Sequence, residues 1–201
     1  MRLGIFGGTF DPPHLGHLIL ASEAYHQLKL DRLLWVLTPH PPHKQNQHIT
    51  PLKVRLEMLE VALAGAPEFE LSTVDIDRLP PYYAVDTINI LRETHPSGVL
   101  AYVMGSDSLR DLPAWHRPDV FLRACDILGV MRRPNDPVDL DLLETRLPGI
   151  KSKVRFIDAS LHDISSTQIR CRVAQGAPYR CYIPAAMYKI IRRERLYRGV
   201  L

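Results

Sequence analysis

The stretch GGTFDPPHLGHL, residues 7–18, places three glycines, two prolines and two histidines between an apolar run and the start of a helical pattern. The run Leu3–Phe6 is typical of a strand, and residues 14–28 carry apolar side chains at every third or fourth position, which predicts an amphipathic helix. The stretch is therefore a strand-to-helix turn. Gly7 and Gly8 let a ligand approach the backbone, and a helix start presents N–H groups and a partial positive charge. An anion is expected to bind here.

The rest of the chain repeats this alternation of strand and helix. Further strands are expected at Leu33–Leu37, Phe69–Ser72, Val99–Met104, Ile127–Met131 and Val154–Ile157. Further helices are expected at residues 51–64, 85–94 and 165–174. This alternation predicts an α/β fold, namely a Rossmann-like doubly wound parallel sheet with helices on both faces and a small C-terminal helical segment. A length of 201 residues with 46% hydrophobic side chains suits a single domain, residues 1–201.

Composition excludes several classes of protein. Nowhere do 18 apolar residues follow one another, and the N-terminus lacks a basic stretch followed by a long apolar run. Neither a membrane span nor a signal peptide is therefore expected, and a cytoplasmic location follows. The three cysteines, Cys125, Cys171 and Cys181, are odd in number and lack CxxC spacing, which argues against a disulfide framework and a zinc cage.

Basic side chains are concentrated at the C-terminal end. Residues 151–201 carry 11 lysines and arginines but 3 acidic side chains. The run KIIRRERLYR, residues 189–198, predicts a helix with Ile190, Ile191 and Leu196 packed inward and its arginines in water. No stripe of alternating aromatic and basic residues is present, so nucleic acid is not expected as a partner.

The unusual stretches of the sequence are expected at one edge of the sheet. Ligands of an open parallel sheet bind beyond the carboxyl ends of its strands. Residues 7–17, 38–48, 104–116 and 131–135 each follow a predicted strand, and SSTQIR at 165–170 starts a helix after the sixth. The polar, proline-rich stretch around residues 38–51 predicts a long loop, and loops of that length in a compact domain are more often functional than idle.

His14 and His17 are three residues apart and share one helical face, with Gly16 leaving room between them. Both imidazoles could donate hydrogen bonds to one phosphate. Two alternatives remain, a metal site and an ordinary helix start. The metal site is disfavoured because Glu23 is too far along the helix to complete it and no HExxH motif occurs.

The second anion site is expected at SSTQIR. Ser165 or Ser166 lies where an N-cap hydroxyl is expected, which leaves Thr167 and the first-turn N–H groups facing an anion. Arg170 follows one turn later with a guanidinium suited to bidentate phosphate contact. The alternative is a plain capped helix.

Taken together, these motifs resemble those of a known family. GGTFDPPHLGHL and ISSTQIR are similar to the HxGH and ISSTxxR motifs of the nucleotidylyltransferase superfamily, in the form found in bacterial nicotinate-mononucleotide adenylyltransferases. Further segments match in order and spacing: PPHK (41–44), YYAVDT (82–87), GSDSLRDLPAWHRPD (105–119) and VMRRP (130–134). The resemblance thus spans essentially the whole chain.

The resemblance implies transfer of an adenylyl group from ATP to nicotinate mononucleotide, with release of pyrophosphate, in NAD biosynthesis. It implies catalytic roles for His14, His17, Lys44 and Arg170. It implies ATP binding by Gly7, Gly8, Thr9, Phe10, His17, Gly105, Asp107, Ser165, Ser166, Thr167 and Arg170. It implies mononucleotide binding by Ala84, Asp86, Thr87, Trp115, His116 and Arg133, with Trp115 stacked on the nicotinate ring. The acceptor phosphate, with a second pKa near ~6, needs no general base at neutral pH.

Mg²⁺ is expected to arrive with ATP, because the sequence offers no acidic cluster to hold a metal by itself. The chain departs from the family at Ala84, where a hydroxyl is usual, which leaves the preference for acid over amide open. Three alternatives also stay open: a nucleotide-sensing module without turnover, and the same reaction on nicotinamide mononucleotide or phosphopantetheine. A homo-oligomer is compatible with the sequence.

Overall fold

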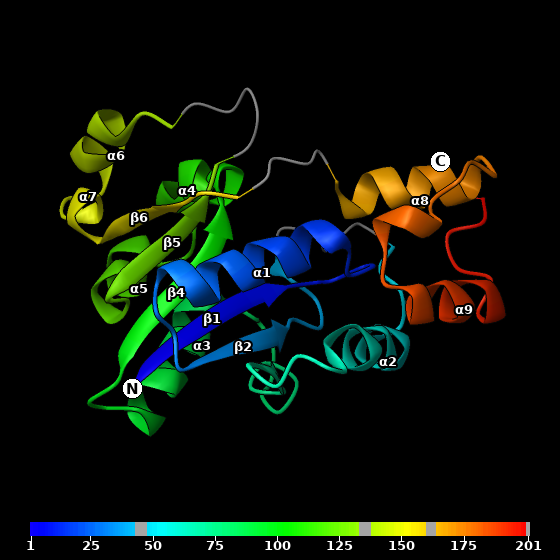
Figure 1. Cartoon of the computed structure of the whole chain (residues 1–201). Coiled ribbons are helices and arrows are strands. Elements are labelled where there is room, and N and C mark those ends of the chain that lie inside the picture. Colours follow the sequence, from blue (N-terminus) through cyan, green and yellow to red (C-terminus); the bar gives the residue numbers. More distant parts are fainter. Residues whose placement is uncertain (43–47, 133–137, 160–163, 200–201) are drawn as a thin grey trace.

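A parallel sheet forms the centre of the protein, seen in a computed structural model that describes residues 1–42, 48–132, 138–159 and 164–199 (Figure 1). Its six strands are β1 (Arg2–Gly8), β2 (Arg32–Leu37), β3 (Phe69–Ser72), β4 (Val99–Gly105), β5 (Ile127–Met131) and β6 (Val154–Ile157). Their spatial order is β3-β2-β1-β4-β5-β6, with every neighbouring pair parallel. All six predicted strands are confirmed, with β1, β2 and β4 longer than expected by one to three residues.

The strand order reverses at β1, which has β2 on one side and β4 on the other. Along the chain, β2 and β3 add in turn on one side of β1, and β4 then pairs with the other edge of β1. Such a switch point leaves a crevice beyond the carboxyl ends of the two strands, which is where doubly wound sheets bind ligands. The turn at residues 7–18 and the start of the helix after β4 both lie there.

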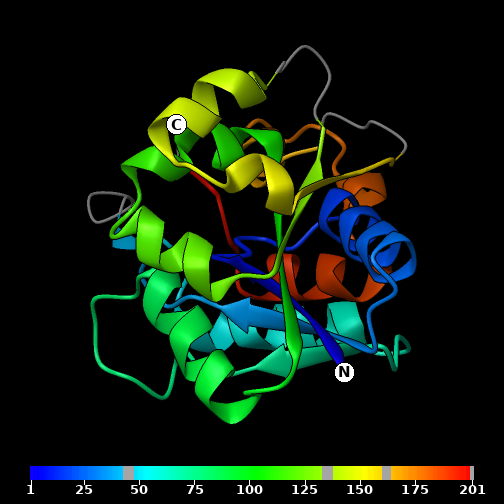
Figure 2. The ribbon, with the colours of Figure 1, turned by 90° about the vertical axis from the view of Figure 1, so that its left-hand side faces the viewer.

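Helices cover both faces of the sheet, as predicted. On one face lie α1 (Leu15–Gln27) and α2 (Leu52–Leu63), and on the other lie α3 (Ala84–Thr94) and α5 (Pro118–Ala124). Figure 2 shows the sheet between the blue helix α1 and the green helices. Between them run α4 (Ser106–Asp111) and a 3-10 turn (Leu112–Ala114), and α6 (Leu140–Arg146) and α7 (Ile150–Lys153) precede β6.

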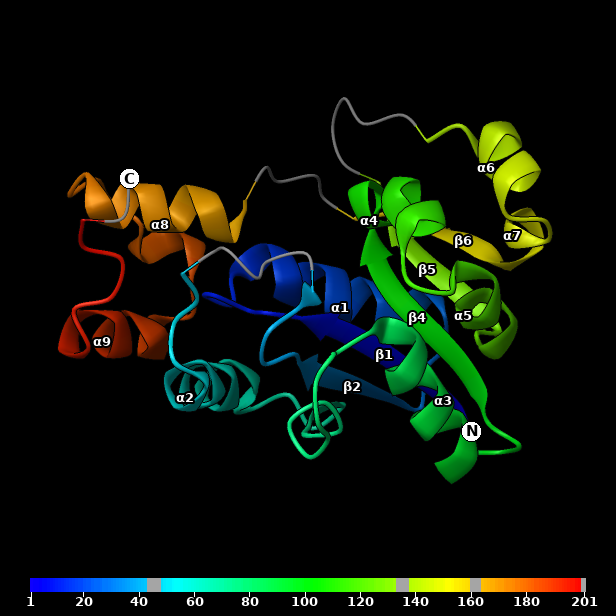
Figure 3. The same cartoon turned by 180° about the vertical axis from the view of Figure 1, so that it is seen from behind.

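The C-terminal helices form a third apolar cluster beyond the end of the sheet. These are α8 (Ser166–Ala174), a 3-10 turn (Arg180–Tyr182) and α9 (Ala185–Arg193). Ile169 of α8 and Met187 and Ile190 of α9 are buried together with Met58 on the outer side of α2. The predicted C-terminal helical segment is therefore confirmed, and it stands next to the carboxyl end of β1 (Figures 1 and 3).

The last helix is shorter than the sequence suggests. Ile190 and Ile191 are buried as predicted, but α9 ends at Arg193 instead of continuing to residue 198. The backbone of Arg195 and Tyr197 is left-handed, with φ of 51° and 62°, and this conformation cannot continue a right-handed helix. Within the described residues, no helix is long and apolar enough to span a membrane.

Candidate active site

The two histidines at the start of α1 cap each other. His14 is the N-cap residue, and its Nδ1 accepts a hydrogen bond from the backbone N–H of His17 at 3.3 Å. His17 Nδ1 in turn accepts from the backbone N–H of His14 at 3.2 Å. The two rings stack with centroids 3.6 Å apart. Since both Nδ1 atoms are acceptors, the proton of each neutral ring lies on Nε2.

Gly16 and Gly7 are required by the close packing around this turn. A Cβ on Gly16 would lie 3.1 Å from Nδ1 of His14 and 3.4 Å from the carbonyl oxygen of Ile164, just before α8. A Cβ on Gly7 would lie 2.8 Å from the hydroxyl of Tyr102. Both glycines therefore make room for the close approach of neighbouring groups, Tyr102 at Gly7 and His14 at Gly16.

Helix α8 is attached to the same turn. Ser165 is its N-cap and accepts from the backbone N–H of Gln168 at 3.2 Å, whereas Ser166 donates to the carbonyl oxygen of Pro12 at 2.9 Å. Arg170 donates from Nη1 to the carbonyl oxygen of Asp11 at 2.8 Å. The predicted meeting of the two helix starts is therefore present: SSTQIR is bonded to the residues just before His14.

A buried junction that was not predicted from the sequence lies beneath this turn. The Arg55 guanidinium, 1% exposed, donates to the carbonyl oxygens of Thr9, Thr38, Pro39 and Thr50 at 2.6–3.0 Å. It thereby joins the loops that follow β1 and β2. Burial lowers the pKa of Arg55, and the negative charge of the nearby Asp11 opposes that shift. The sequence signal was weak, since an arginine in an amphipathic helix usually faces water.

The other side of the crevice carries the stretch predicted to bind the acceptor. Trp115 is half-buried, with its ring edge-on to Phe121 at 5.3 Å and to Tyr102 at 6.2 Å. The exposed ring of His116 stacks on Tyr83 at 4.0 Å, immediately before α3. Burial holds the pKa of Tyr102 well above its usual range, so this phenol is neutral and acts as packing.

A buried ion pair holds the start of α3. Asp75, 2% exposed, forms a salt bridge with Arg78 at 3.0 Å and accepts from the hydroxyls of Thr38 (2.9 Å) and Thr87 (2.6 Å). Arg78 also donates to the carbonyl oxygen of Tyr83 at 3.2 Å. The Thr87 hydroxyl, predicted to bind substrate, is therefore turned into the protein behind the site. The sequence offered no sign of Asp75 or Arg78, because their partners come from three separate segments.

The remaining predicted residues fall into three groups. Gly8, Thr9 and Gly105 lie at the carboxyl ends of β1 and β4, and Ala84, Asp86 and Asp107 lie in the first turns of α3 and α4. Phe10 is in the same turn, but its ring is buried against Phe6, Trp35 and His17, so only its backbone remains for ATP. Lys44 and Arg133 lie outside the described residues. Among the described residues, no group of three His, Cys, Asp or Glu side chains could hold a metal.

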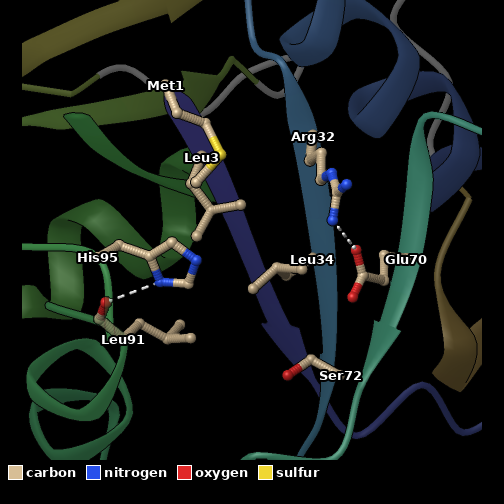
Figure 4. Close-up of a pocket in the computed structure, with 8 residues that line it drawn as sticks. All are labelled: Met1, Leu3, Arg32, Leu34, Glu70, Ser72, Leu91 and His95. Carbon is tan, nitrogen blue, oxygen red and sulfur yellow. Dashed lines mark hydrogen bonds and ion pairs between the residues drawn. The ribbon is translucent and has the colours of Figure 1, made fainter. Parts of the chain in front are cut away.

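A separate pocket of about 360 Å³ lies at the opposite end of the sheet (Figure 4). It is lined by residues at the amino ends of β1 and β2, by β3 and by the end of α3. Figure 4 shows His95 on one side, bonded to the carbonyl oxygen of Leu91, and the exposed Arg32–Glu70 ion pair on the other. None of the predicted site residues lines this pocket.

A match to a protein-family model identifies the class to which this protein belongs. The model of the cytidylyltransferase-like family matches residues 5–172, which include both histidines and Arg170. This match, together with a doubly wound fold that has both helix starts near its switch point, makes the protein a nucleotidyltransferase.

Relatives with known names define the family within that class. A protein of Thermomicrobium roseum named "Probable nicotinate-nucleotide adenylyltransferase" is 43% identical over 99% of this chain and 92% of the relative. The nicotinate-nucleotide adenylyltransferase of Bacillus subtilis is 37% identical over 98% of this chain and 99% of its own length. The chain belongs to the family of nicotinate-nucleotide adenylyltransferases, enzymes of NAD biosynthesis.

A solved structure agrees with the fold. The nicotinic acid mononucleotide adenylyltransferase of Plasmodium falciparum complexed with NaAD superposes with a TM-score of 0.80, covering 98% of this chain and 97% of its own. The same enzyme complexed with APC gives 0.78. Sequence identity in both cases is 18%, so the comparison supports the architecture alone.

Proposed function

We propose that this chain transfers the adenylyl group of ATP to nicotinate mononucleotide, forming nicotinate adenine dinucleotide and pyrophosphate, and that residues 1–201 act as one catalytic unit. An oxygen of the acceptor phosphate attacks the α-phosphorus of ATP, the bond from that phosphorus to the bridging oxygen breaks, and pyrophosphate leaves. The observation that carries the proposal is the mutual capping of His14 and His17 beside the helix that bears Arg170.

On the donor side, the task is to hold mutually repelling phosphates and to stabilise charge that grows in the transition state. The Nε2–H groups of His14 and His17 supply two donors toward the α-phosphate. Arg170 and Lys44 hold the polyphosphate, and the first turn of α8, Ser165 to Thr167, supports the leaving pyrophosphate. Mg²⁺ enters as part of the MgATP substrate.

The turn before α1 and the end of β4 complete the ATP site. Gly7, Gly8, Thr9 and Phe10 line this site from the end of β1 and the turn after it, and Gly105 lines it from the end of β4. Asp107 lies in the first turn of α4, where a short carboxylate suits the two vicinal hydroxyls of a ribose.

On the acceptor side, Trp115 stacks on the nicotinate ring, and Phe121 and Tyr102 fix the plane of the indole. Backbone N–H groups at Ala84, the first residue of α3, and at His116 meet the carboxylate, so the missing hydroxyl at Ala84 is compensated by the helix start.

The remaining acceptor residues act around that carboxylate. We propose that Asp86, in the first turn of α3, and Arg133 also bind nicotinate mononucleotide. Thr87 supports the site through Asp75 without touching the ligand.

Pyrophosphate release tests the proposal. The protein is incubated with MgATP and, in parallel, with nicotinate mononucleotide, nicotinamide mononucleotide or phosphopantetheine. Pyrophosphate should form fastest with nicotinate mononucleotide. Faster turnover of either other acceptor would overturn the substrate assignment, and binding of ATP without turnover of any acceptor would identify a nucleotide sensor. A cytoplasmic location goes with the proposed function.

A further inference from the structure

The segment after α9, residues 194–199, inserts one tyrosine into the protein. Tyr197 is 7% exposed, whereas Arg195 and Arg198 on either side of it are exposed. The left-handed backbone at Arg195 and Tyr197 is unfavourable for residues with side chains, and it persists where surrounding contacts hold it. Figure 3 shows this segment, in red, running from the end of α9 back to α8.

The Tyr197 hydroxyl reaches the turn that carries the histidines. It donates to Oδ1 of Asp11 at 2.6 Å, in a contact that is buried and joins residues 186 positions apart. The other carboxylate oxygen of Asp11 accepts from the backbone N–H of Thr50 at 3.0 Å. The two described donors to this buried carboxylate thus come from the C-terminal segment (Tyr197) and from the loop before α2 (Thr50).

Asp11 lies where the turn before His14 contacts α8. Its carbonyl oxygen accepts from Arg170, and three residues later His14 starts α1. A carboxylate out of water needs hydrogen-bond donors, because an unpartnered buried charge is costly. The Tyr197 hydroxyl and the Thr50 N–H therefore both hold the Asp11 carboxylate in place, beside the turn before His14 and beside Arg170.

We propose that Tyr197 is a positioning residue for adenylyl transfer, acting through Asp11 on the groups that hold the triphosphate. The inference rests on the proposed function. Transfer between two phosphates depends on in-line placement, and displacements of about 1 Å can cost on the order of a hundredfold in rate. The acceptor end, formed by α3 and Trp115, lies outside this contact.

Tyr197→Phe tests the inference, because it removes the hydroxyl and keeps the buried ring. Calorimetric titration with MgATP, in the absence of any acceptor, should show a Kd raised several-fold. Steady-state assays should show kcat lowered by about tenfold, with the KM for nicotinate mononucleotide within about twofold of the unmodified protein. Tyr188→Phe is the matched control, since its ring packs on Tyr179 in the same cluster, 5.3 Å away. Tyr188→Phe should leave the Kd for MgATP, kcat and the KM for nicotinate mononucleotide unchanged.

A second variant keeps the test independent of general destabilisation. If Tyr197 acts through Asp11, Asp11→Asn combined with Tyr197→Phe should be no worse than Asp11→Asn alone. Independent, multiplying losses would overturn the inference, as would unchanged kcat and MgATP affinity in Tyr197→Phe. Equal increases in the apparent constants for both substrates, with a lowered Tm, would show a purely structural role. Failure of the proposed function is recognised separately, because the unmodified protein would then release no pyrophosphate with nicotinate mononucleotide.

Discussion

His14 and His17 lie ring on ring, 3.6 Å between centroids, and each Nδ1 accepts the backbone N–H of the other residue. The pair therefore acts as one rigid unit. The reciprocal bonds satisfy two N–H groups of the helix start and at the same time fix the tautomer in which both Nε2 atoms donate. The two side chains that cap the helix start are thus the same two that we propose to bind phosphate.

His17→Ala should lower kcat by about two orders of magnitude or more while MgATP affinity is largely kept, because a donor to charge that grows in the transition state is lost. The change also removes half of the mutual cap, with a stability cost of about 1 kcal/mol. Rates at saturating substrate and MgATP titrations separate the two effects. A collapse of MgATP affinity with turnover intact at saturation would contradict this role.

Gly16→Ala should impair catalysis although alanine favours helix by about 1 kcal/mol. The new methyl would lie 3.1 Å from Nδ1 of His14, closer than ordinary van der Waals contact, so the ring would have to shift by a few tenths of an ångström. We expect kcat to fall by about tenfold, by analogy with other small misplacements of catalytic groups. Tm from thermal unfolding should change little. Unchanged kcat would show that the ring spacing is not critical.

Trp115→Ala should raise the KM for nicotinate mononucleotide more than the KM for ATP, since a stacking surface of the acceptor is removed. Trp115→Phe keeps a flat ring and should restore part of the affinity. Separate KM measurements for the two substrates decide the matter. Equal effects on both substrates would count against ring stacking at this position.

Thr87→Val should weaken binding of nicotinate mononucleotide, although we propose that Thr87 itself does not contact this ligand. The hydroxyl that donates to Asp75 at 2.6 Å is lost, at a cost of about 1–3 kcal/mol because the buried carboxylate loses a donor. The start of α3 then loosens, and the KM for nicotinate mononucleotide should rise. Thr94→Val is the matched control, because Thr94 ends the same helix and its hydroxyl donates to the carbonyl oxygens of Ile90 and Leu91 in that helix. Comparable changes in both variants would refute the support role.

Arg55→Met should destabilise the protein by about 3–5 kcal/mol, since it leaves buried carbonyl oxygens and the Asp11 carboxylate without their cation. Urea unfolding followed by circular dichroism measures the loss. Glu57→Gln, which removes the exposed ion pair of α2 with Arg193, should have a far smaller effect. Similar unfolding midpoints for the two variants would show that the Arg55 junction contributes little.

The strands, the order of elements along the chain and the helix starts near His14 and Ser165 could be predicted from the sequence alone. These features are local: period-2 and period-3.6 patterns, glycines at a turn and serines at a helix start all act between neighbours in the chain. That is why the six strands and the start of α8 could be predicted closely, and why the stretches around His14 and Ser165 could be recognised together.

What supports those turns depends on tertiary packing. Asp11, Arg55 and Tyr197 meet from positions far apart in the chain, and nothing local distinguishes a buried arginine or tyrosine from one in water. The same holds for Thr87, whose hydroxyl turns inward to a buried carboxylate. Buried polar groups are bonded by whatever the fold brings beside them, so their partners are a property of packing and not of sequence spacing.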